Sequence, residues 1–195
     1  MITGAVLAGG KSVRFGKNKA LQELRGKRFI ERAVESLRLF CDPVIVVAND
    51  LGPYLDLGVP LVRDIVPNQG PLGGIYTALL FSSTDWILVK ATDMPFLVPE
   101  LAALLIGAKE GFDAVVPTLG DYYEPLLALY NRRCLPPIIR QLEDPDERQI
   151  VKFYRKIKVR NIPEEKWRKV DPDALSFRNV NTPYDLIEID GLESG

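Results

Sequence analysis

The sequence predicts an α/β protein: a three-layer α/β/α sandwich built around a mostly parallel central sheet. Short runs of consecutive apolar residues alternate along the chain with longer segments of helical periodicity. The runs are apolar at every position rather than at every second one, which is typical of strands buried on both faces. Strands and helices that alternate in this way form a parallel or mixed sheet covered by helices.

The apolar runs predict seven strands in chain order, the first ending at Gly9 and Gly10 and the second opening with a proline. These strands are residues 2–7, 43–48, 61–62, 86–89, 114–116, 126–130 and 157–159. Apolar residues at helical spacing, and capping residues such as Asn181 or Thr182 before the last segment, predict the helices. The helices are residues 29–40, 72–81, 99–109, 132–143, 146–155 and 182–189.

Composition limits the class of protein. A length of 195 residues favours one domain, residues 1–195, and a net charge of −1 gives no global basic field for nucleic acid or an anionic membrane. No apolar run approaches the roughly 20 residues of a membrane span, and the N-terminus lacks a secretory signal. Cys41 and Cys134 are the only cysteines. We therefore expect a reduced, cytoplasmic protein, with a single disulfide as the alternative.

The sequence contains no histidine. This excludes Ser-His-Asp and Cys-His catalysis and any zinc site that needs imidazole. Acid–base or metal chemistry must therefore come from Asp, Glu, Lys, Tyr or amide groups.

The stretch GAVLAGGKSVRFGKNKAL, which follows the start of the first strand, has the features of a phosphate-binding loop. It misses the P-loop by one residue, because Ala5 stands where that motif needs glycine, and no register supplies G-x-G-x-x-G. Successive amides at Ala8, Gly9 and Gly10 predict an anion-binding nest, with Arg14 and Lys19 close enough to reach the same anion. The alternative is a turn followed by a solvated basic face.

Asp93 follows the fourth strand in ATDMPFL. Ligands of open α/β sheets bind beyond the carboxyl ends of the strands, so this carboxylate is placed at the predicted binding edge. Mg²⁺ takes one or two carboxylates together with phosphate oxygens and water, and Asp93 fits such a ligand. The alternative is a turn or helix-capping aspartate.

Other polar or glycine-rich segments lie at the same predicted edge. The loop NQGPLGGI opens a helix and either lets a nucleobase or ribose approach its backbone or forms a plain helix start. Asp64, Asn49 and Glu124 are each as consistent with a ligand contact as with a loop or strand-entry role. Asn179 and Asn181 lie two apart before the last helix, so an extended segment points both amides the same way, although Asn181 also suits a helix cap.

LAGGKSVRFGKNKAL resembles the signature loop of nucleotidyltransferases that couple an NTP to a phosphorylated acceptor. Taken together, LAGGKSVRFG, GPLGGI, TDMPF, EPLLALY and NVNTPYDL are similar to the motifs of molybdenum cofactor guanylyltransferase, the MobA family. The likeness spans Gly4 to about Leu186. It implies a Rossmann-like sheet of the nucleotide-diphospho-sugar transferase type.

The resemblance also implies an activity: GTP and molybdenum-bound molybdopterin give the guanine dinucleotide cofactor and pyrophosphate, with Mg²⁺ as cofactor. Part of the chain up to about residue 100 would bind the nucleotide, and the later part the acceptor. Arg14, Lys19 and Asp93 would be catalytic. The implied contacts are the backbone of Leu7, Ala8 and Gly9 with GTP, Gly10 and Arg14 in the same loop, Lys19 with the phosphates, Asp64 with the nucleoside, Asp93 with the metal, and Asn179 and Asn181 near the acceptor or metal.

The implied partners are GTP, a phosphorylated molybdopterin acceptor, and molybdoenzymes or cofactor-biosynthesis proteins, without nucleic acid or membrane. Two other functions stay open on the sequence. One is a related transferase that uses CTP or a sugar-phosphate acceptor, and the other is a non-catalytic nucleotide-binding module of the same fold.

Overall fold

The structure, a computed structural model, describes residues 1–9, 18–66, 69–144 and 149–180. Its main sheet has the strand order β10-β7-β9-β6-β1-β4-β5, with β8 paired to β7 outside this path. Only β9 runs antiparallel to its neighbours in that order. The strands are β1 (Thr3–Leu7), β4 (Val44–Ala48), β5 (Leu61–Arg63), β6 (Trp86–Ala91), β7 (Ala114–Leu119), β8 (Tyr122–Tyr123), β9 (Leu127–Asn131) and β10 (Val159–Ile162).

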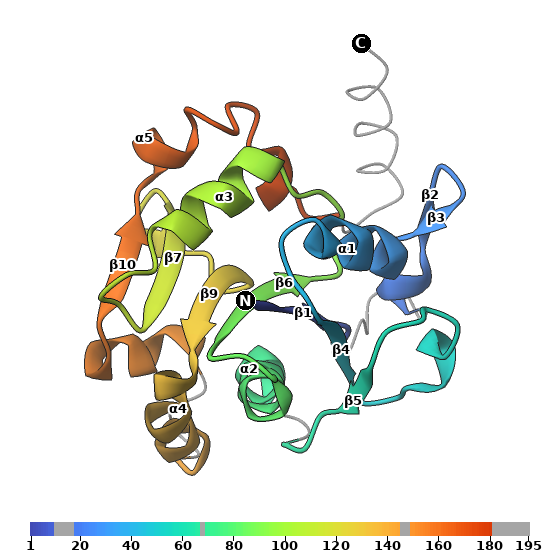
Figure 1. The fold of residues 1–195 in the computed structure, drawn as a ribbon, viewed down its shortest axis with the longest axis horizontal. Helices are drawn as coiled ribbons and strands as arrows, with labels where there is room; N and C mark the ends of the chain where they lie inside the picture. The colour runs from blue at the N-terminus through green and yellow to red at the C-terminus, as the bar shows by residue number, and fades with distance from the viewer. Residues whose placement is uncertain (10–17, 67–68, 145–148, 181–195) are drawn as a thin grey trace.

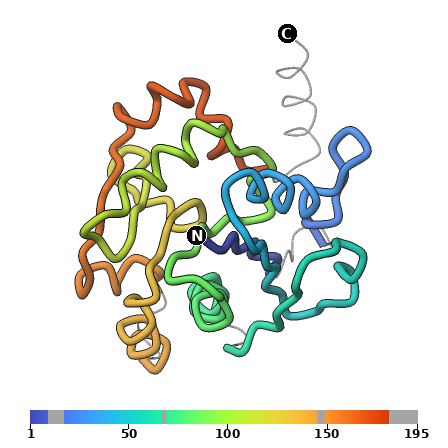
Figure 2. The backbone as a smooth tube through the Cα atoms, in the orientation of Figure 1, coloured from blue at the N-terminus to red at the C-terminus, as the bar shows by residue number. Residues whose placement is uncertain are grey.

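Helices cover both faces of this sheet (Figure 1). The helices α1 and α3 lie on one face and α2 and α4 on the other, and the backbone trace shows the same three layers (Figure 2). The α-helices are α1 (Phe29–Arg38), α2 (Gly70–Phe81), α3 (Pro99–Gly107), α4 (Leu135–Leu142) and α5 (Glu164–Trp167). The predicted three-layer α/β/α class with a mostly parallel sheet is therefore confirmed.

The side chains of alternate strand residues build two apolar clusters, one on each face of the sheet. Val6, Leu88 and Leu129 pack with α1 and α3, whereas Ala5, Val89 and Ala128 pack with α2 and α4. All six side chains are fully buried. Burial on both faces explains why the strands are apolar at consecutive positions.

Five of the predicted strands match observed strands to within about two residues at each end. They are residues 2–7, 43–48, 61–62, 86–89 and 126–130. The strand predicted at 114–116 is longer, running to Leu119. The late strand predicted at 157–159 is instead Val159–Ile162. Its position is set by pairing with β7, where Val159 lies opposite Ala114, while the amide of Ile157 closes the preceding 3-10 turn on Tyr154 O.

The helices predicted over residues 29–40, 72–81 and 99–109 are confirmed. The helix predicted at 132–143 is a 3-10 turn, Arg132–Cys134, followed by α4. The segment predicted as helix at 146–155 is a 3-10 helix over Ile150–Lys156, and the predicted helix 182–189 lies outside the described residues.

Further short elements were not predicted. They are the hairpin β2 (Glu23–Leu24) and β3 (Lys27–Arg28), strand β8, helix α5, and 3-10 helices over Lys19–Leu21, Gly52–Tyr54 and Leu175–Phe177.

The two adjacent glycines of GPLGGI allow the start of α2 to pack closely on the sheet. A Cβ atom on Gly73 would lie 2.7 Å from the carbonyl oxygen of Val66, and one on Gly74 would lie 3.3 Å from Cδ2 of Leu7. Both glycines are buried. These two residues therefore serve helix packing, and the contact of this loop with a nucleobase or ribose stays a prediction.

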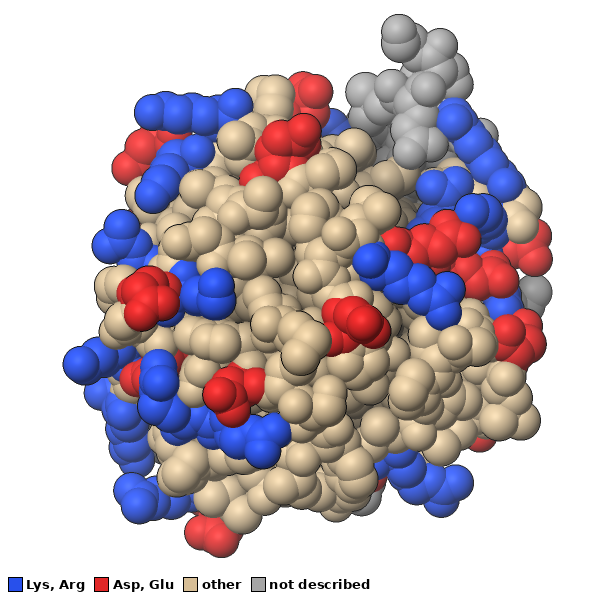
Figure 3. Space-filling view, in the orientation of Figure 1, with Lys and Arg blue, Asp and Glu red and all other residues tan. Residues whose placement is uncertain are grey.

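Neither cysteine forms a disulfide: Cys41 and Cys134 are free and buried, and burial raises the pKa of each thiol to about 12. No helix within the described part of the chain is both long enough and apolar enough to cross a membrane. Figure 3 shows Lys and Arg interspersed with Asp and Glu on the viewed face, in line with the net charge of −1.

We predict that Gly73→Ala lowers the free energy of unfolding by about 1–3 kcal/mol, the usual cost of overpacking a core. The added methyl group meets a backbone carbonyl, which cannot rotate away as a flexible side chain can. Urea unfolding followed by circular dichroism measures this change.

The matched control is Gly107→Ala at the last residue of α3, where a Cβ meets no atom within 4 Å. This variant is expected to gain about 0.5–1 kcal/mol from the higher helix propensity of alanine. Equal stability of the two variants would contradict the packing role of Gly73.

Candidate active site

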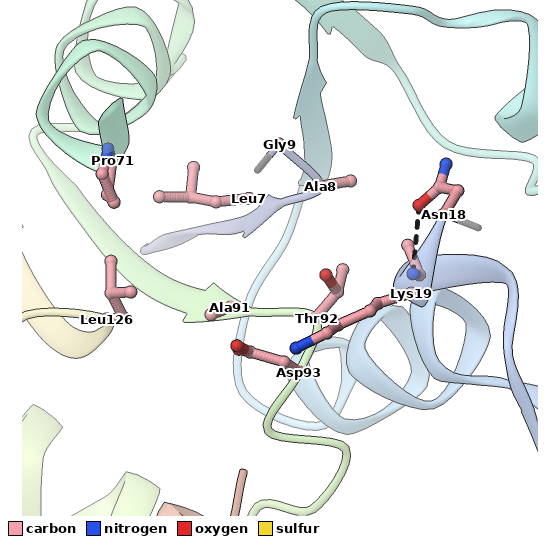
Figure 4. Close-up of a pocket in the computed structure, with 11 residues that line it drawn as sticks. Leu7, Ala8, Gly9, Asn18, Lys19, Pro71, Ala91, Thr92, Asp93 and Leu126 are labelled. Carbon is pink, nitrogen blue, oxygen red and sulfur yellow. Dashed lines mark hydrogen bonds between the residues drawn. The ribbon is translucent and has the colours of Figure 1, made fainter. Parts of the chain in front are cut away.

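The pairing of β1 with β6 brings two separate strand ends together. These strands are parallel neighbours, with Leu7 opposite Ala91, so Gly9 and Asp93 each lie two residues beyond the paired positions. A pocket of about 270 Å³ opens at this edge (Figure 4). Its lining residues are Leu7, Ala8, Gly9, Asn18, Lys19, Ala20, Pro71, Ala91, Thr92, Asp93 and Leu126.

The first loop supplies fewer free amides than the sequence suggests. The amide of Ala8 donates to Val47 O at 2.9 Å, so it extends the sheet and is not available to an anion. Within the described chain, no acceptor takes the amide hydrogen of Gly9, which lies exposed in the pocket wall. The predicted residues Gly10 and Arg14 lie outside the described residues.

Asn49 lies beside the same loop. A Cβ atom on Gly9 would be 3.8 Å from Nδ2 of Asn49. The exposed Asn49 side chain therefore stands next to the glycine turn, although it is not among the residues that line the pocket.

Lys19 is placed by a capped 3-10 turn over Lys19–Leu21. Oδ1 of Asn18 accepts the amide of Ala20 at 3.1 Å, and Nδ2 of Asn18 donates to the Tyr54 hydroxyl at 2.7 Å. The Lys19 side chain is half-buried and extends across the pocket toward Asp93 (Figure 4). Asn18 was not predicted as a site residue, yet it holds the turn from which Lys19 reaches the pocket.

Asp93 stands in the turn directly after β6 and is half-buried. It caps no helix, because the residue before α3 is Val98. None of the residues that the structure describes donates a hydrogen bond to its carboxylate. A half-buried carboxylate that faces a pocket entered by a lysine fits the donor set that Mg²⁺ uses beside phosphate oxygens.

The segment before the last predicted helix is joined to this turn. The amide of Val180 donates to Asp93 O at 2.8 Å, and the Val180 side chain packs with Leu24, Phe29 and Phe96. Asn179, the residue before Val180, is therefore held near the backbone of Asp93, and its side chain is exposed. Asn181 lies outside the described residues.

Asp64 is fixed by contacts with α2 and does not line the pocket. Its Oδ1 accepts the Thr77 hydroxyl at 2.8 Å and the amide of Val66 at 3.0 Å. The hydroxyl oxygen of Thr77 also accepts the amide of Ile65 at 3.2 Å. This carboxylate thus organises the loop between β5 and α2, and its predicted contact with a nucleoside stays a prediction.

Glu124 precedes the pocket-lining Leu126 by two residues and is hydrogen-bonded to it. Its Oε1 accepts the amide of Leu126 at 3.0 Å, and Leu126 lines the pocket. Burial raises the pKa of Glu124, and the negative charge of Asp93 raises it further. Behind this turn, the hydroxyls of Tyr130 and Tyr154 lie 2.6 Å apart, and that of Tyr130 lies 2.8 Å from Pro125 O, which anchors the turn.

Lys90 is a second residue near the site, besides Asn18, that was not predicted from the sequence. It is fully buried in β6, and its ammonium donates to the carbonyl oxygens of Met94 and Phe96. Burial lowers its pKa to about 7, against the opposing effect of the nearby Asp93 charge. The detectable signal was a lysine inside the otherwise apolar run WILVKA.

A glycine turn, a lysine and an aspartate at the carboxyl edge of such a sheet fit a nucleotidyltransferase domain. The family model of the MobA-like NTP transferase domain matches residues 4–159. The chain belongs to this family, as the sequence resemblance implied.

Individual relatives agree with this assignment. The molybdenum cofactor guanylyltransferase of Desulfosudis oleivorans is 39% identical over 188 residues, covering 95% of this chain and 92% of that protein. The crystal structure of molybdopterin-guanine dinucleotide biosynthesis protein A from Archaeoglobus fulgidus has a TM-score of 0.83 and 33% identity, covering 99% of both chains. A cytidylyltransferase acting on 2-C-methyl-D-erythritol 4-phosphate, from Thermus thermophilus, shares the fold at 16% identity, a TM-score of 0.68 and 98% coverage of both chains.

Proposed function

We propose that this protein transfers GMP from GTP to the molybdenum–molybdopterin cofactor, forming the guanine dinucleotide cofactor and pyrophosphate. The observation that carries the proposal is the convergence of Gly9, Lys19 and Asp93 on one pocket from three segments of the chain. The names of relatives that match this chain over almost its whole length support the same reaction.

The chemistry of the proposed reaction needs no histidine. An oxygen of the acceptor's terminal phosphate bonds to the α-phosphorus of GTP, the bond from that phosphorus to the bridging oxygen breaks, and its electron pair leaves with pyrophosphate. The second pKa of a phosphate monoester is about 6, so the attacking oxygen is already largely ionised at neutral pH. The protein must mainly hold two anions together and stabilise the leaving group.

Positive charge at the pocket meets this requirement. Lys19 extends toward Asp93 into the pocket where the triphosphate is proposed to bind (Figure 4), and Arg14 and Gly10 belong to the same loop in the family motif. The pocket is lined by Leu7, Ala8 and Gly9, whose backbone is proposed to contact the nucleotide. Asp93 would hold Mg²⁺, which neutralises charge on the phosphates when bound.

We further assign nucleotide binding to the chain up to about residue 100, with Asp64 toward the nucleoside, and acceptor binding to the later part. The position of Leu126 in the pocket wall, and the hydrogen bond from Val180 to Asp93, support a contribution of the later part. Asn179 and Asn181 are proposed near the acceptor or metal. The product would pass to a molybdoenzyme or another cofactor-biosynthesis protein in the cytoplasm.

A nucleotide panel tests the proposed function. Purified protein is supplied with Mg²⁺, molybdopterin-loaded acceptor and GTP, CTP, ATP or UTP, and pyrophosphate release and dinucleotide product are measured. We expect product with GTP. Product with CTP instead would identify a related transferase, and nucleotide binding without pyrophosphate release would identify a non-catalytic module.

Asp93→Ala is expected to abolish metal-dependent turnover, because it removes the carboxylate proposed to hold Mg²⁺. Pyrophosphate release over a range of Mg²⁺ concentrations measures the loss, and circular dichroism checks that the variant is folded. Asp121→Ala, at an exposed aspartate in the turn between β7 and β8, is the control and should keep the wild-type rate. Normal turnover by Asp93→Ala would refute the role of Asp93.

Lys19→Ala is expected to lower the rate by about 10²–10³, the usual loss for one preorganised electrostatic group. The matched control is Lys27→Ala. Lys27 is exposed, its ammonium group lies 2.8 Å from Oε2 of Glu35, and it does not line the pocket. Single-turnover rates at saturating GTP separate this effect from weaker nucleotide binding. A Lys19→Ala rate within a factor of two or so of wild type would exclude the proposed contact with the phosphates.

A further inference from the structure

The burial of Lys90 is unfavourable in free energy. It lies in β6 at the centre of the sheet, between β1 and β9, and no part of its side chain is exposed. Burying an ammonium group costs free energy unless it is paired and hydrogen-bonded. An apolar side chain of similar length, such as methionine, would fill the same volume without that cost, so core packing alone does not explain the lysine.

Two hydrogen bonds of the Lys90 ammonium group lead into the segment that follows Asp93. Its ammonium donates to the carbonyl oxygens of Met94 and Phe96. Residues 94–98 form neither helix nor strand, and Pro95 between the two acceptors has no amide hydrogen. The lysine therefore supplies bonds that regular secondary structure would otherwise provide.

This segment is held from the other side as well. The Val180 amide donates to Asp93 O at 2.8 Å, and the Phe96 side chain packs against Val180 and Phe29. The carbonyl groups of Asp93, Met94 and Phe96 are thus fixed by donors from β6 and from Val180. The backbone of Asp93, whose side chain lines the pocket, is held directly by Val180 and is adjacent to Met94, whose carbonyl group Lys90 holds.

We propose that Lys90 is a positioning residue: by holding the Met94 and Phe96 carbonyls, it sets the direction in which Asp93 presents its carboxylate to the divalent ion of the nucleotide complex. This inference rests on the proposed function of Asp93 as the metal ligand. Groups that orient metal ligands from behind commonly change metal affinity or activity by about 10–100-fold when they are removed.

The test compares Lys90→Met, which removes the ammonium donor at similar volume, with Lys90→Gln, which retains an amide NH2 donor on a shorter side chain. Mn²⁺ is the probe, and its affinity for the full-length protein with GTP is measured by electron paramagnetic resonance. Thermal unfolding is measured on the same samples. The control is Ser82→Ala, since Ser82 is buried and donates to Thr84 O at 2.8 Å at the opposite edge of the same sheet.

We expect Lys90→Met to bind Mn²⁺ about 10–100-fold more weakly, Lys90→Gln to fall between it and wild type, and Ser82→Ala to bind normally. The melting temperatures of Lys90→Met and Ser82→Ala should be similar, because each loses buried donors. A supporting readout is that excess Mg²⁺ restores pyrophosphate release to Lys90→Met but not to Asp93→Ala.

Unchanged Mn²⁺ affinity in a folded Lys90→Met variant would overturn the proposal. It would equally be overturned if both Lys90 variants failed to fold, because Lys90 would then be part of the folding core. A wild-type protein that binds Mn²⁺ and GTP without releasing pyrophosphate would defeat the proposed function alone, and the Mn²⁺ comparison would still decide the role of Lys90. Absence of any nucleotide-dependent Mn²⁺ binding by the wild type would defeat both.

Discussion

The parallel pairing of β1 with β6 is the constraint on which the rest of the site depends. β1 has parallel neighbours on both sides, and the apolar side chains of its two faces fill separate clusters. A slip of one residue would turn every side chain of the strand to the wrong cluster. It would also move the glycine turn along the strand by about 3.3 Å relative to Asp93. Core packing therefore sets the spacing between the two halves of the pocket.

Much of the fold could be predicted from the sequence because its strands are buried on both faces and its helices follow their own periodicity. The elements that escaped prediction depend on partners distant in sequence or are too short for a pattern. The β2–β3 hairpin has two-residue strands and turns through Arg25 and Gly26, both with positive φ. The boundaries of β10 follow from the register of β7, which local composition does not encode.

The candidate site was predictable to the extent that strand ends locate it, and for this reason Gly9, Lys19 and Asp93 were found. Which amide of the first loop is free could not be predicted, because the Ala8 amide is taken by Val47 from another strand. The packing role of Gly73 and Gly74 in α2 could not be predicted for a similar reason, since their contacts are made by Val66 and Leu7 across the fold. Lys90 stood out by its charge, but its acceptors lie in an irregular segment that no periodicity describes.

The reversed direction of β9 affects how an enzyme of this architecture can diversify. A parallel strand at that place would need a connection crossing the sheet from end to end. Instead, the chain leaves β7 and enters β9 on the side of the pocket, through a short hairpin whose tip exposes Tyr122. Residues inserted at such a tip displace neither strands nor helices. The chain can therefore lengthen at this edge of the sheet while Gly9, Lys19 and Asp93 keep their places around the pocket.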